Sequence, residues 1–274
     1  MFNQLEILSN EQNKKLSEIR SFIKNLNGVC VAYSGGVDST LVASIAFEQL
    51  GNKAIAITGV SPALANSLLE EARSQAKWIG VKHLEIKTSE LDHDNYSQNP
   101  KDRCFTCKKE LHKHTTYLSK KLNYQIVLDG INLDDLGDYR PGIQAAKEAG
   151  VISPLAKFNF SKKDIRDISK ALGFPWWDKP AQPCLSSRFP YGHEITKNRL
   201  NMVEQAEEYL KKSGLAEVRV RCQGSTARIE IPKNELKNFF KKYDLDDLLQ
   251  YFSNLGFNCT SLDLEGLVSG KLNR

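Results

Sequence analysis

The sequence predicts an α/β protein: a parallel β-sheet with helices on both faces, followed by a smaller α+β domain. Short apolar segments alternate with amphipathic ones along residues 28–128, and the first apolar segment leads through a glycine turn into a helix. The pattern changes near residue 190, where helices and alternating segments follow one another in a different order. We therefore expect one domain at residues 1–190 and a second at 191–274.

The elements of the first domain are expected from periodicity and chain breakers. Gly28–Tyr33 is short, apolar and partly β-branched, which is typical of a buried strand. Residues 37–50 are apolar on one face and stop at Gly51, which indicates a helix. We likewise expect a helix within 1–27, strands at 53–58, 83–86 and 125–128, and helices at 64–79 and 103–122. Strands separated by helices imply a parallel sheet.

In the second domain Thr196 is the expected N-cap of a helix that runs to Lys212. Alternating polarity then predicts two neighbouring strands. The expected elements are strands at 216–222 and 226–231, helices at 233–243 and 245–255, and a last strand at 257–264.

Composition excludes several classes of protein. The chain of 274 residues is 41% hydrophobic and 26% charged, as in ordinary globular proteins. No apolar run reaches the ~18 residues that a membrane span needs, so we expect no membrane partner. The start lacks a basic segment leading into an apolar one, so we expect no signal peptide and a cytoplasmic protein. The net charge of +5 suits phosphate-bearing ligands without demanding nucleic acid.

The six cysteines fall into two groups. In a reducing cytosol structural disulfides are rare, so each cysteine needs another explanation. The first group lies in apolar, strand-like segments and is expected to be buried: Cys30, Cys222 and Cys259. The second lies in polar surroundings and is a candidate for chemistry: Cys104, Cys107 and Cys184.

The turn Ser34-Gly-Gly-Val-Asp-Ser39 is the strongest motif. Its glycines let the backbone approach a ligand, and the helix that follows directs unpaired N–H groups into the same space. A phosphate chain fits there, and Asp38 inside an anion-binding loop suggests a bridging Mg²⁺. The alternative is a plain tight turn. Neither G-x-x-x-x-G-K-[ST] nor G-x-G-x-x-G is present.

Two loops are candidate ligand contacts. Asp129–Gly142 carries aspartates at 129, 134, 135 and 138 beside Asn132 and Arg140, which favours a metal or nucleotide contact over a solvated helix start. In Lys179–Gly192 three prolines restrict the backbone around Cys184, although a linker between domains has the same composition.

Arg219 and Arg221 are expected on one face of a strand, as are Arg228 and Glu230. Two arginines on one face can clamp a phosphate. A solvated sheet face with cross-strand ion pairs is the alternative.

The Ser-Gly-Gly-Val-Asp-Ser loop resembles that of the ATP pyrophosphatase (PP-loop) superfamily. The resemblance implies an adenine nucleotide α-hydrolase-like fold, cleavage of ATP between the α- and β-phosphates, and transfer of AMP to an acceptor oxygen. It also implies that the adenine lies near Thr58–Val60 and Gly130–Asn132, at the carboxyl ends of strands.

Further segments make nearly the whole chain similar to the ATP-dependent sacrificial sulfur transferases of the LarE family. They are residues 99–108 (NPKDRCFTCK), 134–142 (DDLGDYRPG), 184–192 (CLSSRFPYG) and 262–266 (LDLEG). The resemblance implies an enzyme that adenylates a carboxylate of a pyridinium dicarboxylate mononucleotide, releases AMP and pyrophosphate, and replaces oxygen by sulfur on the way to the nickel-pincer nucleotide. It also implies a homo-oligomer.

The resemblance implies the following site residues. ATP is expected at Ser34, Gly35, Gly36, Asp38, Ser39, Thr58, Gly130 and Asn132, and the substrate at Ser187, Arg188, Arg219 and Arg221. Magnesium is expected at Asp38, Glu207 and Glu230, and the catalytic residues are Cys184, Cys104, Cys107 and Arg188.

The source of the sulfur is open between two routes. Cys184 occupies the sulfur-donor position, and its thiolate can attack the acyl-adenylate and leave dehydroalanine behind after elimination. Alternatively, Cys104, Cys107 and Cys184 can hold a [4Fe-4S] cluster with one open iron that carries the transferred sulfide. A zinc site completed by His112 or His114, or a redox pair at Cys104 and Cys107, would also use these thiols.

Other functions remain candidates. A tRNA thiolase would use the basic stretch 101–121, although such a run is more often a solvated helix face, and we do not expect nucleic acid. An ammonia-dependent amide-forming synthetase would leave the three cysteines without a task. A nucleotide-sensing regulator would need no chemistry at all.

Overall fold

The structure is a computed structural model that describes residues 4–124, 126–137, 141–268 and 270–271. The chain forms two compact units, and both are discontinuous in sequence. The first comprises Met1–Ser61, Asn66–Glu90 and Asp102–Gln182, and the second comprises Pro62–Ala65, Leu91–Lys101 and Pro183–Arg274. The segments 62–65 and 91–101 therefore fold with the C-terminal part of the chain. The predicted boundary at residue 190 stays a prediction.

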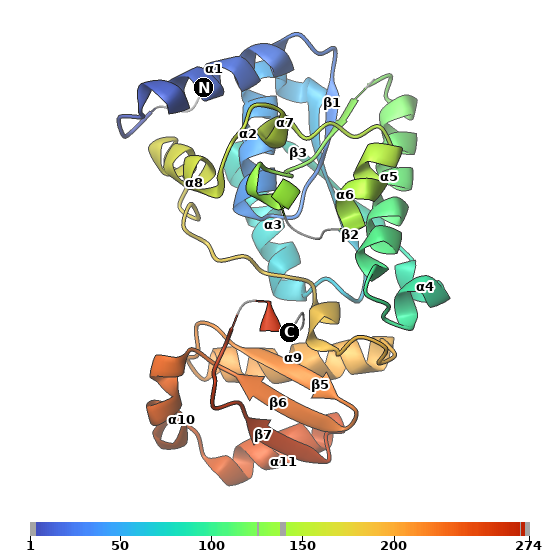
Figure 1. Ribbon diagram of the computed structural model, residues 1–274, viewed down its shortest axis with the longest axis vertical. Coiled ribbons are helices and arrows are strands. Elements are labelled where there is room, and N and C mark those ends of the chain that lie inside the picture. Colours follow the sequence, from blue (N-terminus) through green and yellow to red (C-terminus); the bar gives the residue numbers. More distant parts are fainter. Residues whose placement is uncertain (1–3, 125, 138–140, 269, 272–274) are drawn as a thin grey trace. The chain divides into compact units, whose positions relative to one another are not determined.

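The first unit contains a four-stranded parallel sheet in the order β3-β2-β1-β4 (Figure 1). In the central strand Cys30 pairs with Ile55 on one side and with Val127 on the other. The strands are β1 (Val29–Ala32), β2 (Ala54–Val60), β3 (Lys82–Lys87) and β4 (Ile126–Leu128). The predicted fold class is confirmed, because a parallel sheet lies among helices.

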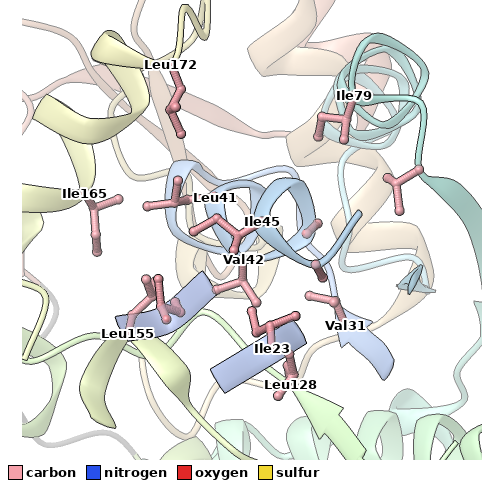
Figure 2. Packing of buried hydrophobic residues seen from close by; sticks show 14 of the residues in the cluster. Ile23, Val31, Leu41, Val42, Ile45, Ile79, Leu128, Leu155, Ile165 and Leu172 are labelled. Atoms are coloured by element: carbon pink, nitrogen blue, oxygen red, sulfur yellow. The ribbon is translucent and has the colours of Figure 1, made fainter. Parts of the chain in front are cut away.

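The two faces of this sheet carry separate apolar clusters, because successive side chains of a strand point in opposite directions. Val29 and Val31 belong to the larger cluster, which includes Leu41, Val42 and Ile45. Figure 2 shows this packing around the apolar side of the helix that follows the turn at 34–36. The opposite face carries Cys30, Ile55, Ile57 and Val127, against which Leu118 packs. Helices on both faces keep β1 and most of β2 out of water, whereas the edge strand β3 is partly exposed.

The helices of the first unit lie on both sides of this sheet (Figure 1). α2 contributes to the larger cluster and α5 to the smaller one. The helices between β4 and residue 172 were not predicted. The helices are α1 (Asn10–Lys24), α2 (Val37–Leu50), α3 (Asn66–Ile79), α5 (Arg103–Lys121), α6 (Pro141–Glu148), α7 (Pro154–Lys157) and α8 (Lys162–Ala171).

The second unit is an α+β fold with a three-stranded sheet in the order β5-β6-β7. β5 and β6 are antiparallel, and β6 and β7 are parallel. Its elements are α4 (Asp94–Ser97), the 3₁₀ turn η4 (Leu185–Arg188), α9 (Lys197–Lys212), β5 (Arg219–Gln223), β6 (Thr226–Glu230), α10 (Leu236–Lys242), α11 (Leu245–Leu255) and β7 (Cys259–Leu262). This agrees with the C-terminal α+β unit that the sequence predicts.

The cysteine predictions are partly corrected. Cys30 and Cys222 are buried as predicted, but Cys259 is exposed, so its predicted burial is wrong. Cys259 begins β7, which pairs with β6 only and forms an edge of the small sheet. At an edge a strand-like sequence does not ensure burial.

Within the described ranges, no helix combines the length and the apolar character that crossing a membrane requires.

Candidate functional site

The glycine turn lies between β1 and α2 and leaves the first turn of α2 without a capping side chain. Gly36 is the N-cap, so the N-cap residue has no side chain to accept a hydrogen bond from the helix N–H groups. Gly35 has φ of 70°, and a Cβ at this position would lie 3.0 Å from the Cβ of Ala72 on α3. The backbone therefore passes close to α3 on one side, and N–H groups with a positive helix end remain available for an anion.

The two serines of the motif brace this turn. The Ser34 amide donates to Oγ of Ser39 at 3.2 Å, and the two hydroxyl oxygens are 3.1 Å apart. The Gly36 amide in turn donates to Oγ of Ser34 at 3.3 Å. Ser34 is exposed and Ser39 is buried. The motif residues thus lie together, with Ser34 as the hydroxyl that faces solvent.

The strand order places this turn at the switch point of the sheet. β1 lies between β2 and β4. The chain runs from β1 to β2 and β3 on one side and then crosses to β4 on the other side, and open α/β sheets bind ligands at such a point. Gly130 follows β4, and a Cβ there would lie 2.7 Å from the amide nitrogen of Ser39. The close approach of Gly130 to the turn requires a residue without a side chain.

Asp38 and Asn132 meet at the same edge. Asn132 Nδ2 donates to Oδ2 of Asp38 at 3.2 Å, and Asp38 lies in the first turn of α2. Asn132 is fully buried, and its backbone amide donates to Asp135 at 3.3 Å. A carboxylate oxygen beside the predicted phosphate site is the kind of ligand that Mg²⁺ prefers. The structure thus brings together the predicted residues of both the turn and the segment after β4.

Thr58 is buried, and its hydroxyl is already engaged. Oγ1 lies 2.8 Å from the carbonyl oxygen of Tyr33 and 2.7 Å from Nε2 of His83. The carbonyl can only accept, so the hydroxyl donates to it and Nε2 of His83 must be the protonated nitrogen. The Thr58 side chain therefore joins β2 to the end of β1. A contact of Thr58 with ATP stays a prediction.

The other aspartates after β4 have different tasks. Asp134 accepts the backbone N–H of Lys162 at 2.6 Å, so it holds the start of α8. Burial raises the pKa of Asp129, and hydrogen bonding by Ser153 and the charge of Lys108 offset part of that rise. Asp138 and Arg140 lie outside the described residues.

Cys104 and Cys107 lie in the first turn of α5. Cys104 is exposed and Cys107 is half-buried. Residues three apart on a helix are neighbours on its surface, so this spacing suits two ligands of one group. Within the part of the chain that the structure describes, no group of three or more His, Cys, Asp or Glu side chains is arranged to hold a metal. Since Cys184 belongs to the second unit, the three-cysteine site stays a prediction.

Cys184 is exposed, and Arg188 holds the loop that carries it. Arg188 Nη1 donates to the carbonyl oxygens of Pro183 at 2.9 Å and Cys184 at 3.2 Å. It also contacts Oγ of Ser187 at 2.9 Å. Nε and Nη2 of Arg188 bind the two carboxylate oxygens of Glu207 at 2.8 and 3.0 Å. Both partners of this ion pair are buried, and the pair fixes the backbone on either side of the thiol.

A second buried pair lies on the adjacent sheet. Arg221 Nε and Nη2 bind Oε2 of Glu230 at 3.0 and 2.9 Å, and its Nη1 donates to the carbonyl oxygen of Ser187 at 2.6 Å. Oε1 of Glu230 accepts from Arg228 at 3.2 Å. One cross-strand ion pair of the kind considered for this face, Arg221–Glu230, is therefore present, but it is buried rather than solvated. Arg221 connects β5 to the loop of Cys184.

Arg219 differs from its neighbours. It pairs with Glu230 across the strands in register, yet among the described residues it forms no ion pair. Burial lowers the pKa of Arg219, and the charges of Arg188 and Arg221 lower it further. The charges of Glu230 and Glu207 act in the opposite sense. Arg219 is thus a half-buried cation without an ion pair among the described residues, which favours an anionic ligand.

Each carboxylate oxygen of Glu207 and Glu230 accepts a hydrogen bond from an arginine. Oε1 of Glu207 additionally accepts the backbone N–H of Val220 at 3.0 Å. A magnesium ion at either residue would have to displace a guanidinium group, so their role as metal ligands stays a prediction.

Sequence reasoning missed the residues that brace the Cys184 loop. Asn99 is buried, has φ of 55°, and donates from Nδ2 to the carbonyl oxygens of Phe189 and Pro190 at 3.2 and 2.7 Å. The hydroxyl of Tyr96 lies 2.6 Å from Oγ of Ser186. Asn-Pro is a turn signal, and Asn tolerates positive φ, so Asn99 could have been identified locally. The pairing of residues 96–99 with residues 186–190 could not.

Known proteins resemble the chain over nearly its full length. It is 54% identical to an uncharacterized protein of Synechocystis sp. over 95% of this chain and 97% of that one. It is 34% identical to the pyridinium-3,5-bisthiocarboxylic acid mononucleotide synthase of Lactiplantibacillus plantarum, over 94% of each chain. An uncharacterized protein of Methanocaldococcus jannaschii is 32% identical over 92% of this chain and 96% of its own length. No family model matches the chain.

Proposed function

The chain belongs to the family of the pyridinium-3,5-bisthiocarboxylic acid mononucleotide synthase, and we propose from this premise that it is an ATP-dependent sulfur transferase. Its proposed substrate is a pyridinium dicarboxylate mononucleotide, in which a carboxylate oxygen is replaced by sulfur during nickel-pincer nucleotide biosynthesis. The single observation that carries the proposal is the exposed thiol of Cys184 on a loop whose carbonyls are held by the buried Arg188–Glu207 pair.

In the first step a carboxylate oxygen of the substrate attacks the α-phosphorus of ATP. The bond from that phosphorus to the oxygen bridging to the β-phosphate breaks, and pyrophosphate leaves with the electron pair. The amides at residues 36–39 and the exposed hydroxyl of Ser34 would receive the phosphates. Asp38, at the start of α2, would hold Mg²⁺, which when bound neutralises phosphate charge.

In the second step the Cys184 thiolate attacks the acyl carbon of the adenylate, and AMP leaves. The product is a thioester between Cys184 and the substrate. Arg188 supports this step indirectly, because it holds the carbonyls of residues 183 and 184 and so limits the positions that the sulfur can take.

In the third step a base removes the proton on Cα of Cys184. The electron pair forms the Cα–Cβ double bond, and the Cβ–S bond breaks. Sulfur leaves on the substrate as a thiocarboxylate, and dehydroalanine remains in the chain. Negative charge that builds up on Cα spreads to the carbonyl oxygen of Cys184, which already accepts a hydrogen bond from Arg188 at 3.2 Å. That contact favours the elimination.

Cys104 and Cys107 support the second route to the same product. Their sulfurs, at helical spacing in the first turn of α5, suit two ligands of an iron–sulfur cluster, with Cys184 as the third. Such a cluster would supply sulfide in place of the Cys184 sulfur, and the polypeptide would then be unchanged after reaction.

Arg219 is the proposed anchor for the phosphate of the substrate. It lies half-buried beside Arg188 and Arg221, whose charges are matched by Glu207 and Glu230. A phosphate would place its charge next to the one guanidinium of this group that forms no ion pair among the described residues. By the same family resemblance we propose a cytoplasmic homo-oligomer, with no membrane or nucleic acid partner.

The proposal is tested with protein prepared without oxygen, incubated with ATP, Mg²⁺ and the pyridinium dicarboxylate mononucleotide. We expect a product with sulfur in place of oxygen, and its loss in Cys184→Ser. Cys259→Ser is the matched control, because Cys259 is also an exposed cysteine of the second unit. A polypeptide lighter by one hydrogen sulfide selects the sacrifice of Cys184, and an unchanged mass selects the cluster. Sulfur transfer at the normal rate in Cys184→Ser contradicts the proposal.

A further inference from the structure

Lys108 lies on the side of α5 that faces the sheet. Along this helix His112, Thr115 and Ser119 are buried, and Lys108 is one turn before His112 on the same stripe. Lys108 is nevertheless exposed. The buried part of this stripe therefore ends before Lys108, whose side chain is open to solvent on the side of α5 that carries His112.

The end of the sheet nearest to Lys108 is the carboxyl end of its strands. Gly59 is close to the carboxyl end of β2, and a Cβ there would lie 3.0 Å from Cδ1 of Leu111, which precedes His112. The first turn of α5 consequently projects beyond the edge at which the glycine turn after β1 and Gly130 after β4 are found. Lys108 and the proposed phosphate site share that edge of the first unit.

The charge of Lys108 contributes to the pKa shifts of two buried groups, Asp129 and His112. It offsets part of the rise in the pKa of Asp129 that burial causes. Burial, together with the charge of Lys108, lowers the pKa of His112 to about 4. The Lys108 ammonium therefore lies near Asp129, and Asp129 is followed by Gly130, the residue packed against the amide of Ser39.

The fold leaves room for the stem of Lys108 at one glycine. A Cβ on Gly142, in the first turn of α6, would lie 2.9 Å from Cγ of Lys108 and 3.6 Å from the carbonyl oxygen of Cys104. Any side chain at residue 142 would push the lysine from its place. Within the described ranges Lys108 forms no ion pair, and its side chain is exposed.

We propose that Lys108 is a catalytic residue of the adenylation step, whose ammonium group binds the phosphate chain of ATP and stabilises the charge that develops at the α-phosphate. The inference rests on the proposed function. The oxygen–phosphorus bond to the substrate forms, the bond to the pyrophosphate oxygen breaks, and Lys108 keeps its proton throughout. A fixed cation helps here because the transition state concentrates charge on the transferred group.

The experiment measures pyrophosphate release from ATP in the presence of the substrate, for Lys108→Met and Lys108→Arg. We expect the first variant to lose the rate by about 10²–10³-fold, the usual effect of removing one such charge-stabilising group, and the second to recover part of it. Lys109→Met is the matched control, because Lys109 lies over the ring of Phe105, and it should keep the normal rate. Gly142→Ala should lower the rate while Lys108 is intact.

Substrate saturation separates this role from a structural one. Lys108→Met should lower kcat for pyrophosphate release while its thermal unfolding midpoint stays normal. Normal pyrophosphate release in Lys108→Met overturns the inference. So does a defect confined to sulfur transfer, because Lys108 would then serve Cys104, one turn before it on α5. Absence of pyrophosphate release in the unchanged protein is a different result: it refutes the proposed function itself.

Discussion

At the scale of single residues, Glu207 holds two parts of the second unit together. Its carboxylate binds Arg188 of the Cys184 loop and the backbone N–H of Val220 in β5. Side chains of the ion pair are only 8% and 4% exposed. Removing one charge from a buried pair leaves the other without compensation.

We therefore predict that Glu207→Gln lowers the free energy of unfolding by about 3–5 kcal/mol, the range for breaking a buried ion pair. Urea unfolding measures this loss. Glu208→Gln is the control, because Glu208 pairs with the exposed Lys212 one turn away and should change stability by less than about 0.5 kcal/mol. Equal losses of unfolding free energy in the two variants would show that burial of the Arg188–Glu207 pair does not determine its contribution to stability.

Gly35 is the residue on which the shape of the phosphate turn depends most. We predict that Gly35→Ala weakens ATP binding and stability together, because it combines positive φ with a contact 3.0 Å from Ala72. Gly51→Ala is the control, since Gly51 also has positive φ but no atom within 4 Å of the added Cβ. Calorimetric titration with ATP distinguishes them. An ATP affinity equally reduced in both variants would contradict the account.

Several of these residues could be identified from sequence, but their partners could not. The turn Ser34–Ser39 is formed by residues adjacent in sequence, so its glycines and serines predict its conformation directly. Glu207 is one of three glutamates close together in α9, and only the packing of the helix shows that it faces Arg188. The contact of Thr58 with ATP stays a prediction, and its hydroxyl contacts with Tyr33 and His83 had no signal in the sequence.

Among the helices and strands, the start of a helix can carry a local sequence signal even where no helix was predicted. α8 begins with a capping box in which Ser161 and Asp164 bind each other's backbone N–H groups. That signal is present in the sequence. Strand ends are different: β5 begins at Arg219 rather than at the predicted residue 216, because hydrogen bonds to β6 decide where pairing starts.

The capping box gives a pH-dependent prediction. Burial opposes ionisation of Asp164, but hydrogen bonds from Lys15 and Ser161 prevail and hold its pKa below the ordinary value of 3.8. A lowered carboxyl pKa stabilises the fold above pH 3.8, and this contribution is lost as the pH falls through the folded-state value.

Asp164→Asn should therefore lose about 1 kcal/mol of unfolding free energy at pH 7, allowing for solvent screening of this partly exposed group. The difference from the unchanged protein should shrink as the pH is lowered below 3.8. Urea titrations at several pH values measure it. A difference that is constant from pH 7 to acid conditions would show that the charge of Asp164 is not the cause.

At the scale of the whole molecule, the fold class was predictable because short, partly β-branched apolar segments alternate with longer amphipathic segments, several of which end at glycines. The grouping of distant segments was not. Leu185 donates its N–H to the carbonyl oxygen of Ala63 at 2.9 Å, and Ile195 donates to Ser97 at 2.7 Å. Such contacts join segments about a hundred residues apart, and no local sequence pattern predicts them. The same lack of local signal leaves the three-cysteine site a prediction.

In the proposed reaction ATP activates a carboxylate whose oxygen is then exchanged for sulfur. The most direct measurement follows oxygen-18 from the carboxylates of the labelled substrate. The carboxylate oxygen attacks the α-phosphorus, so the account predicts that each sulfur transferred leaves one labelled oxygen in AMP. Unlabelled AMP beside a sulfur-containing product, or ADP in place of AMP, would contradict it.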